Sequence, residues 1–420
     1  MQVLICLTVM NTGEKFSENM SYREYRSPQR QSRERRESRK HNYNKSGVII
    51  SAPDRQLLVI VAFLVVLGLL AIFSATAPKC QREGVLLITM AFKQGIYAVV
   101  GFVAMLFFSR FDYKRLEKYN TKFMWTVIAL LLILQFTPLG VVINGAKRWI
   151  NLGFMQLQPS ELAKPLFCML LATMFKDKIS METVKNFASK YIWQMVFILG
   201  LIYKQPNLSM VLILLATTGI LYLIAMGPLL PVYCMLGVGG VGALSFLPKL
   251  LRGYQMDRIT IWLNPGSDAL GKGYNIIQSL IAFATGGIMG SGYGGSIQKL
   301  AYLPECHTDF IFAIIAEEFG LLGCLFVIGL FAALVLRGMW VAKRCPDMYG
   351  KLLAAGITFI FGLQALFNMS VASSLMPVTG VTLPFISYGG TSIIVSLAMI
   401  GILLNISRQR IKRLGTQTNE

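Results

Sequence analysis

The sequence predicts an all-α polytopic membrane protein with about ten transmembrane helices and one large extracytoplasmic loop. Of its 420 residues, 55% are hydrophobic and only 14% are charged, and the mean hydropathy is +0.58. A soluble protein carries about 25% charged residues. The net charge is nevertheless +20. Apolar runs together with a basic excess exclude an ordinary cytosolic enzyme, a secreted domain and an acidic disordered chain.

Ten apolar segments approach the length of about 20 residues that a helix needs to cross a bilayer. They are residues 57–77, 88–108, 122–139, 161–176, 190–204, 207–226, 229–248, 309–336, 350–371 and 385–407. An even number of spans puts both termini on one side. Basic residues then fall in the loops of that same side, as the positive-inside rule requires for the cytoplasmic face.

The two ends of the chain are basic and polar, unlike its apolar centre. Residues 1–55 form a basic, polar segment that lacks the apolar residues needed to pack, so we predict a disordered cytoplasmic tail. Its charge favours anionic lipid headgroups over nucleic acid, because no aromatic stacking pattern accompanies it. Residues 56–408 form the transmembrane domain, and residues 409–420 form a second basic cytoplasmic tail.

Residues 249–308, between the seventh and eighth predicted spans, form the long loop, which lies outside and is rich in glycine. Long connections in compact proteins are usually functional. A second outer feature, residues 140–160, carries Lys147 and Arg148. Seven cysteines are scattered singly, so neither a zinc site nor a thiol-redox motif is predicted.

Ionisable residues near the predicted spans are functional candidates, because burying charge in a bilayer is costly. Pro304 suits the first turn of a helix, and a helix beginning there would put Glu305 and Asp309 on one face. Neighbouring carboxylates raise each other's proton affinity, which helps one of them act as a base. The alternative is structural: Glu305 favours the helix N-terminus and Asp309 pairs with a lysine.

A group of cations could line one outward cavity and bind a phosphate or pyrophosphate. Its members are Lys93, Lys147, Arg148 and Lys164. The structural alternatives are that Lys147 and Arg148 are solvated loop charges and that Lys164 pairs internally with Glu161. From the residues alone, two classes remain: an enzyme acting on a lipid-linked phosphate, or a transporter of one.

Several sequence blocks resemble the SEDS family of peptidoglycan polymerases, the FtsW/RodA/SpoVE type. The resemblance covers roughly residues 55–410. The blocks are Asn144–Trp149, Gln158–Lys164, Pro265–Ser279, Gly294–Lys299, Tyr302–Phe312 and Met376–Gly390. Within the family, the pattern around Gln298, Lys299 and Glu305 is most similar to the division member, FtsW.

The resemblance implies glycosyl transfer on lipid II at the outer face of the bacterial cytoplasmic membrane, during septal division. Asp309 would be the base that activates the acceptor hydroxyl, with Glu305 orienting it. Undecaprenyl pyrophosphate would leave, its charge stabilised by the cations and by a divalent cation, Mg²⁺ or Mn²⁺, with no organic cofactor. Further substrate-binding residues would be Glu161, Gln298, Lys299, His307 and Ser387.

The implied partners are lipid II, a class B penicillin-binding transpeptidase, other divisome proteins and the membrane, with no nucleic acid. Rival functions are a lipid II flippase, a RodA-like elongation polymerase and a scaffold for the transpeptidase. One departure from the family pattern stands out: Gln-Pro-Asp is usual after the fifth span, whereas this chain has Gln205, Pro206 and Asn207, followed by Ser209 in place of glycine.

Overall fold

The computed structural model describes residues 48–50, 52–143, 146–153, 155–176, 192–225, 253–271 and 273–411. Within them, residues Ile50–Ile411 form one compact, mostly helical unit. Its helices are α3 (Arg55–Arg82), α4 (Thr89–Arg110), α5 (Tyr113–Phe136), α6 (Pro159–Phe175), α8 (Trp193–Lys204), α9 (Leu208–Ile224), α11 (Gly253–Leu263), α12 (Tyr274–Gly286), α13 (Ile311–Arg344), α14 (Met348–Ala372) and α15 (Gly390–Arg408), with 3-10 turns η2 (Pro265–Asp268) and η3 (Gln298–Leu300). The strands are β1 (Val48–Ile50), β2 (Gly140–Ile143), β3 (Ala146–Asn151), β4 (Gln156–Leu157) and β5 (Gln409–Ile411).

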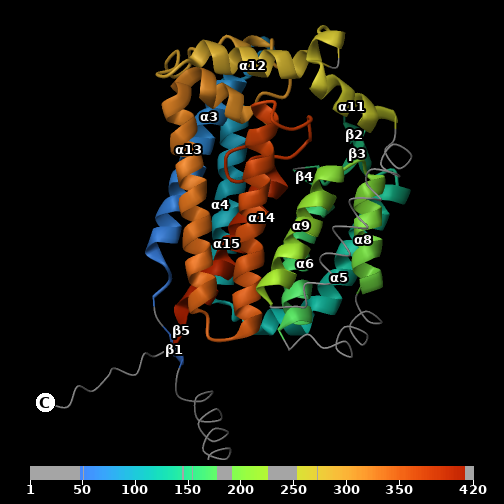
Figure 1. Ribbon diagram of the computed structural model, residues 1–420, viewed down its shortest axis with the longest axis vertical. Helices are drawn as coiled ribbons and strands as arrows, with labels where there is room; N and C mark the ends of the chain where they lie inside the picture. Colours follow the sequence, from blue (N-terminus) through green and yellow to red (C-terminus); the bar gives the residue numbers. More distant parts are fainter. Residues whose placement is uncertain are drawn as a thin grey trace, which may run out of the picture. The chain divides into compact units, whose positions relative to one another are not determined.

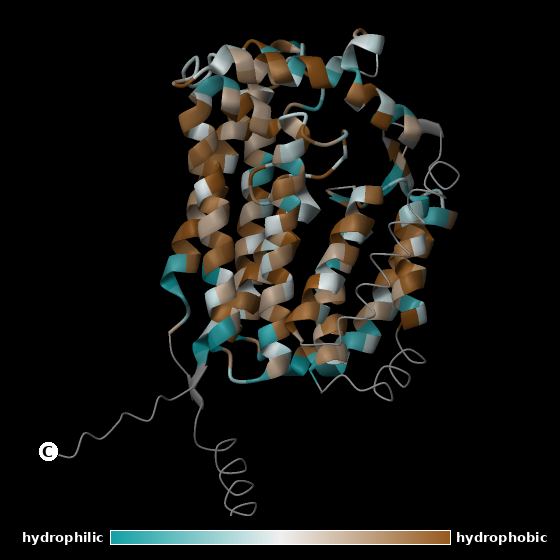
Figure 2. Ribbon diagram, viewed as in Figure 1, coloured by the Kyte–Doolittle hydropathy of each residue, from teal (hydrophilic) through white to brown (hydrophobic). Residues whose placement is uncertain are grey.

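The long helices confirm a helical membrane protein. Six of the described helices are long and apolar enough to cross a bilayer: α3, α4, α5, α13, α14 and α15. Two shorter apolar helices, α8 and α9, coincide with predicted spans, and α6 coincides with a third. The predicted span 229–248 lies outside the described residues, so the count of ten stays a prediction. Figure 2 shows hydrophobic residues along the middle of these helices and hydrophilic residues gathered at their lower ends.

Small residues let the helices approach closely. The most extensive helix pair is α4 with α15. A side chain at Gly101 would press on Leu397 of α15, and one at Gly401 would press on the backbone of Met105 in α4. Close backbone approach through small residues is how helices associate in a bilayer, where burial from water cannot drive them together.

The lower ends of the helices are joined by buried charges. Asp54 is the N-cap of α3, where its carboxylate accepts a hydrogen bond from the amide of Leu57. The same carboxylate pairs with the Arg337 guanidinium of α13 (2.7 Å), and the Asp54 amide donates to the Ser407 hydroxyl of α15 (3.1 Å). Three helices therefore meet at one acidic cap.

The segment predicted as a long outer loop, residues 249–308, contains helices, which corrects the prediction of an irregular connection. From residue 253 on it contains α11, η2, α12 and η3, and Figure 1 shows α12 lying across the upper end of the long helices. Two hydrogen bonds fasten this layer to the end of α14. The Trp262 indole donates to the carbonyl of Ser374 (2.9 Å), and the Ser279 hydroxyl donates to the carbonyl of Ala372 (2.6 Å).

A small antiparallel sheet, with strand order β2-β3-β4, lies at the same end. In the β2–β3 register Trp149 faces Val141 and Lys147 faces Val142, with a bulge between the two pairs. The central strand β3 therefore carries both Lys147 and Arg148, the cations of the second outer feature. Residues 1–47 and 412–420, which hold most of both predicted tails, lie outside the described residues.

Candidate active site

Asp309 lies in a tight turn before α13 rather than within a helix. The prediction of a helix beginning at Pro304 is wrong, because α13 begins at Ile311 and Glu305 has a left-handed backbone (φ 54°) that no helix continues. The Glu305 carbonyl accepts hydrogen bonds from the amide of Thr308 (3.1 Å) and the amide of Phe310 (3.4 Å). Glu305 and Asp309 are brought together by this turn, residues 301–310, which we call the Asp309 turn.

A second segment, the capping loop (residues 373–389), lies against the Asp309 turn. The Ser387 hydroxyl donates to the carbonyl of Thr308 (2.6 Å). The Tyr388 amide donates to the carbonyl of His307 (2.9 Å), and the rings of these two residues lie 5.8 Å apart. Ser387 thus acts on the backbone beside Asp309, a positioning contact that its assignment to substrate did not anticipate.

Asn368 of α14 joins the two segments. Its side-chain amide donates to the carbonyl of Asp309 (2.9 Å) and to the carbonyl of Val381 in the capping loop (2.7 Å). Asn368 is 1% exposed. A buried amide with both donors satisfied therefore holds the backbone of Asp309 and that of the capping loop against α14.

The electrostatic surroundings of Asp309 suit a base. The side chain is partly buried, and burial together with the neighbouring Glu305 carboxylate raises its pKa to about 7. The guanidinium groups of Arg148 and Arg258 oppose this shift. A carboxyl with this pKa is half ionised at neutral pH, so it can accept a proton and hold it.

Arg148 is directed toward Asp309 by backbone carbonyls. Its guanidinium donates to the carbonyl of Gln205 (3.1 Å) and to that of Pro206 (2.5 Å). A side chain at Gly380 in the capping loop would lie 3.0 Å from Nη1 of Arg148 and 3.6 Å from Oδ2 of Asp309. The absence of a side chain at Gly380 therefore leaves open the space beside both groups.

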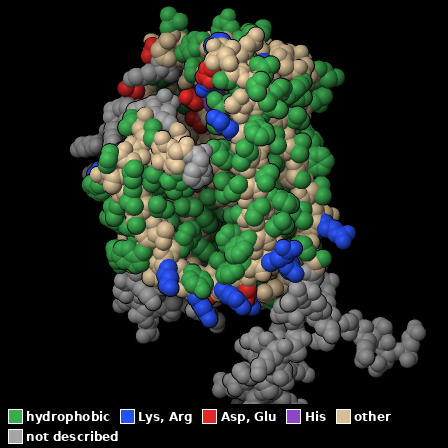
Figure 3. Space-filling view, turned by 180° about the vertical axis from the view of Figure 1, so that it is seen from behind, with side chains coloured by type: hydrophobic (Ala, Val, Ile, Leu, Met, Phe, Trp, Pro, Cys, Tyr) green, Lys and Arg blue, Asp and Glu red, His purple; other side chains and the backbone are tan. Residues whose placement is uncertain are grey.

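Arg258 was missed by the sequence reasoning. It lies on α11, inside the segment interpreted as a loop, and its guanidinium donates to the carbonyl of Val378 in the capping loop (2.9 Å). One signal could have found it: a positive residue on the predicted outer side runs against the positive-inside rule, as Arg148 does. Figure 3 shows acidic and basic side chains gathered around a hollow at the upper end of the molecule.

The remaining predicted cations have other surroundings. Lys93 is exposed on α4, and the Lys147 ammonium donates to the carbonyl of Thr137 (2.6 Å). Lys164 is 1% exposed, pairs with Glu161 (2.6 Å) and donates to the Gln364 side chain (3.0 Å). The structural alternative for Lys164, an internal ion pair, is the one that the structure has. The charges that act on Asp309 are instead Glu305, Arg148 and Arg258.

Three further predicted substrate-binding residues contact other groups of the protein: Gln298, Lys299 and His307. Gln298 and Lys299 are buried in η3, where the Lys299 ammonium pairs with Glu318 of α13 (2.7 Å). Burial lowers the pKa of the His307 imidazole, and the neighbouring Glu305 carboxylate opposes this shift. Contact of these three residues with substrate stays a prediction.

The comparisons with known proteins show which family the chain is similar to. A family model described as "Cell cycle protein", of the FtsW/RodA/SpoVE type, matches residues 55–412. The chain belongs to the FtsW/RodA/SpoVE family. It is 39% identical to the probable peptidoglycan glycosyltransferase FtsW of Geobacter metallireducens (84% of this chain, 94% of the relative). It is 35% identical to stage V sporulation protein E of Bacillus subtilis (85% and 98%).

Solved structures extend the likeness to the fold. One is a chain from a peptidoglycan synthase complex that coordinates polymerization and crosslinking, with a TM-score of 0.70 and 28% identity over 85% of this chain and 98% of that one. Another is the rod shape determining protein RodA of Thermus thermophilus, with a TM-score of 0.61 and 26% identity over 85% and 97%. The predicted membership in this family is confirmed.

The departure from the family pattern has a structural account. Asn207 is the N-cap of α9, where its side chain accepts a hydrogen bond from the amide of Met210 (3.4 Å). Asn and Asp cap helices about equally well. The neighbouring Gln205 and Pro206 orient Arg148 through carbonyls, which the change does not alter. The capping role that an Asp could fill at this position is therefore filled by Asn207 in this chain.

Proposed function

We propose that the chain is a peptidoglycan glycosyltransferase that polymerises lipid II into glycan strands during septal cell division. The observation that carries the proposal is the Asp309 carboxyl, with its pKa raised to about 7, between Glu305 and two guanidinium groups. Membership in a family whose named relatives include peptidoglycan glycosyltransferases supports it.

In the proposed reaction, Asp309 accepts the proton of the acceptor sugar's 4-hydroxyl. The hydroxyl oxygen forms a bond to the anomeric carbon of the donor chain, and the bond from that carbon to the pyrophosphate breaks. Undecaprenyl pyrophosphate leaves. Glu305 raises the proton affinity of Asp309, so the base is strong enough to accept a proton near neutral pH and still be ionised beforehand.

Negative charge builds on the leaving pyrophosphate, and the cations beside Asp309 are placed to stabilise it. Arg148 is held by two carbonyls and Arg258 by one. Donors that are already oriented need no reorganisation when the charge forms, which is why they accelerate such steps. Lys93 and Lys147 would contact the substrate at the edges of this site.

The carboxylates of the site could hold a divalent cation only if the phosphates of the substrate supplied further ligands. Among the described residues, no group of three or more His, Cys, Asp or Glu side chains could hold a metal ion. Mg²⁺ is commonly bound by one or two carboxylates plus substrate phosphates. Glu305 is the carboxylate that would hold it here, and the ion would add positive charge beside the pyrophosphate.

The proposed setting is the bacterial cytoplasmic membrane, with both termini in the cytoplasm and Asp309 at the outer face. The distribution of charge supports this orientation, because basic side chains gather at the lower end of the molecule, opposite the site (Figure 3). A class B penicillin-binding transpeptidase and other divisome proteins would be the partners. The likeness to a chain of a synthase complex that coordinates polymerization and crosslinking supports the transpeptidase.

The proposal is tested by purifying the chain with its transpeptidase partner, adding lipid II and separating the products on a gel. We expect glycan strands from the wild type and none from Asp309→Asn. Asp112→Asn is the matched control. Asp112 is the N-cap of α5, where asparagine serves equally well, so this variant polymerises like the wild type. Strands from Asp309→Asn would show that the base is elsewhere.

Two rivals are separated by the same preparation. If the wild type makes no strands but moves lipid II across vesicles, the chain is a flippase. If it does neither but the transpeptidase loses activity without it, the chain is a scaffold. Depletion in cells separates the division role from an elongation role, because loss of septation gives filaments whereas loss of elongation gives rounded cells.

A further inference from the structure

Helix α13 is broken about three turns after the Asp309 turn, and a second segment is built into the break. Gly320 has φ 63° and ψ −160°, a conformation outside any helix. Residues 287–300, which we call the strap, pass directly beside it. A side chain at Gly320 would collide with the carbonyl of Ile288 in the strap. Both the backbone conformation and the close approach therefore require glycine.

The strap replaces hydrogen bonds that the helix loses at the break. The Ser291 amide donates to the carbonyl of Glu317 (2.9 Å). The Gly292 amide donates to the carbonyl of Glu318 (3.0 Å). Because the backbone of α13 is completed by the strap, the two cannot separate without leaving buried polar groups unpaired.

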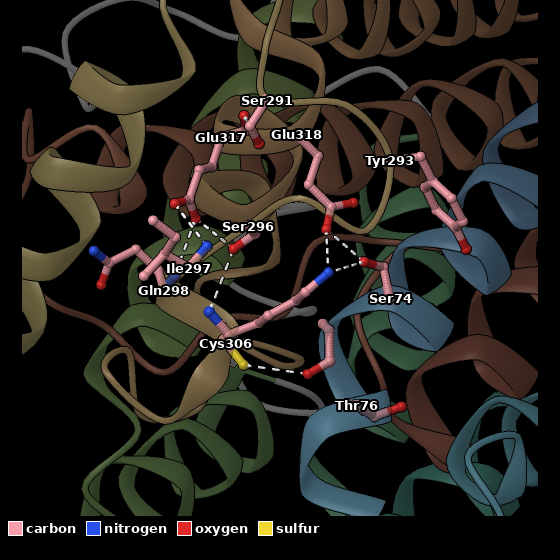
Figure 4. Close-up of polar contacts among 12 residues, drawn as sticks. Ser74, Thr76, Ser291, Tyr293, Ser296, Ile297, Gln298, Cys306, Glu317 and Glu318 are labelled. Carbon is pink, nitrogen blue, oxygen red and sulfur yellow. Dashed lines mark hydrogen bonds and ion pairs between the residues drawn. The ribbon is translucent and has the colours of Figure 1, made fainter. Parts of the chain in front are cut away.

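The side chain of Glu317 binds the end of the strap. Its carboxylate accepts hydrogen bonds from the amides of Ile297 (3.0 Å) and Gln298 (3.3 Å) and from the Ser296 hydroxyl. These groups form the N-terminus of η3, where a negative charge is favourable. Figure 4 shows the Glu317 carboxylate directed to this end of the strap.

The side chain of Glu318 joins three segments. It is 1% exposed. Its Oε1 accepts from the Lys299 ammonium (2.7 Å) and from the Ser74 hydroxyl of α3 (2.5 Å). Lys299 also donates to Ser74 (2.8 Å). The triangle of Glu318, Lys299 and Ser74 therefore fixes the strap and α3 to α13; Figure 4 labels Glu318 and Ser74, with dashed lines between their side chains.

The same contacts reach the Asp309 turn, which begins two residues after Lys299. Within it, the Leu303 amide donates to the carbonyl of Gln298 (2.9 Å). The Cys306 thiol lies 3.7 Å from the carbonyl of Ala75, the residue after Ser74. The turn is thus bounded by η3 on one side and α13 on the other, and Glu317 and Glu318 connect the two.

We propose that Glu318 and Lys299, through Ser74, are positioning residues that set the place of the Asp309 turn relative to the guanidinium groups of Arg148 and Arg258. The proposal rests on the proposed glycosyltransferase function. It assigns Lys299 to the support of the base rather than to substrate. It also makes the break in α13 part of the catalytic machinery, acting on Asp309 through the strap.

Stability alone is a poor reason to keep this ion pair. Replacing both members of a buried ion pair by uncharged residues of similar volume is often neutral for folding. A double variant, Lys299→Met with Glu318→Gln, therefore removes the charges while keeping the volume. We expect it to unfold at the wild-type temperature. The matched control removes an ion pair at the lower end, Lys176 with Glu117 (2.5 Å), by Lys176→Met with Glu117→Gln.

Polymerisation by the complex with its transpeptidase is then measured against lipid II concentration and pH. A displacement of a catalytic group by about 1 Å can lower the rate roughly 100-fold. We therefore expect kcat of the double variant to fall by about 10- to 100-fold, with KM for lipid II unchanged. The groups facing Asp309 are Glu305, Arg148 and Arg258. Because burial is the main cause of its raised pKa, a loosened turn moves the acid limb of the rate profile to lower pH.

A second readout needs no activity. Cys306 lies in the Asp309 turn, is buried, and burial raises the pKa of its thiol to about 11. Alkylation by a maleimide, followed at the Cys306 peptide by mass spectrometry, reports how often the turn opens. We expect about tenfold faster alkylation in the double variant than in the wild type or the control. Lys299→Arg keeps a cation beside Glu318, so we expect this variant to have the wild-type rate of polymerisation and the wild-type rate of Cys306 alkylation.

The outcomes separate this inference from the proposed function. A double variant with wild-type kcat, pH profile and Cys306 alkylation would overturn the positioning role. Equal losses in the double variant and the control would do the same. If the wild type makes no strands, the proposed function fails. Faster Cys306 alkylation in the double variant would then still show that the triangle holds the turn.

Discussion

Two regions beside α13 each hold a pair of acids, and they differ in what surrounds them. In the Asp309 turn, Asp309 is partly exposed and lies near two guanidinium groups that come from other elements. At the break, Glu318 is 1% exposed and pairs with Lys299, and Glu317 caps η3. Two acids close together in the sequence thus serve structure in one region and suit proton transfer in the other.

The difference teaches that acids and cations near a membrane helix do not by themselves mark a reactive site. The pair of Lys164 and Glu161 makes the same point, since both are almost completely buried and bound to each other. What distinguishes Asp309 is a raised pKa, access to solvent and cations held by carbonyls so that they face it. Four predictions test this comparison.

The largest effect is expected from Lys299→Met alone. It leaves the Glu318 carboxylate buried without its cation, which costs about 3–5 kcal/mol of folding free energy. Thermal unfolding of the purified complex measures the loss, and Glu318→Gln added to it restores the wild-type temperature. A single variant as stable as the wild type would show that Glu318 does not depend on the Lys299 charge.

Arg148→Gln is expected to affect the reaction rather than the fold. Removing one donor that stabilises developing charge lowers kcat by about 100-fold, with unfolding unchanged. The matched control is Arg344→Gln at the lower end, where the guanidinium packs on the Trp340 ring (3.7 Å). Equal rates for the two variants would remove Arg148 from the catalytic site.

The pH profile of polymerisation depends on the ionisation of Asp309. The base must be a carboxylate, and its pKa is about 7, so kcat/KM is expected to fall about tenfold per pH unit below that value. Because Arg148 lowers this pKa, Arg148→Gln moves the acid limb to higher pH. A profile that is flat from pH 5 to pH 8, a range of about three units around this group, would contradict the assignment.

The smallest effect is expected from Asn207→Asp, which restores the usual family residue. Since both side chains cap α9 and leave the Arg148 carbonyls in place, folding free energy should change by less than about 0.5 kcal/mol. Initial rates should stay at the wild-type level. A large gain in rate would mean that the family's acid has a role in the reaction that Asn207 cannot fill.

Hydropathy was sufficient to predict the long helices, because burial in lipid demands long apolar runs whatever their tertiary contacts. It could not predict α11 and α12. These helices are too short to span, and α12 is held by packing on α13, where Phe283 meets Phe312, and by a hydrogen bond from the Ser279 hydroxyl to the end of α14. No periodicity reveals these contacts. Their segment therefore resembled a loop.

The sequence motifs predicted that Asp309, Glu305 and Arg148 belong to the site, but not which backbone conformation and packing bring them together. The left-handed backbone of Glu305 could not be foreseen, because no glycine marks it. Arg258 is 51 residues before Asp309 in the sequence. Its guanidinium nevertheless lowers the pKa of Asp309, because the fold brings α11 to the same end of the molecule as the Asp309 turn. The ion pairs of Lys164 with Glu161 of its own helix and of Lys299 with Glu318 of α13 depend on how the helices pack, and their contact with substrate stays a prediction.

The small sheet also fixes where the lipid ends. A sheet of three strands has two edges, β2 and β4, and at β4 the carbonyl of Gln156 is paired by the Thr391 hydroxyl of α15 rather than by another strand. Hydrocarbon does not tolerate such edges, so lipid chains stop short of the sheet. Arg148 lies on its central strand. We therefore expect the sugars that Arg148 would meet under the proposed function to stay in water, with only the polyprenyl tails of the substrate among the acyl chains.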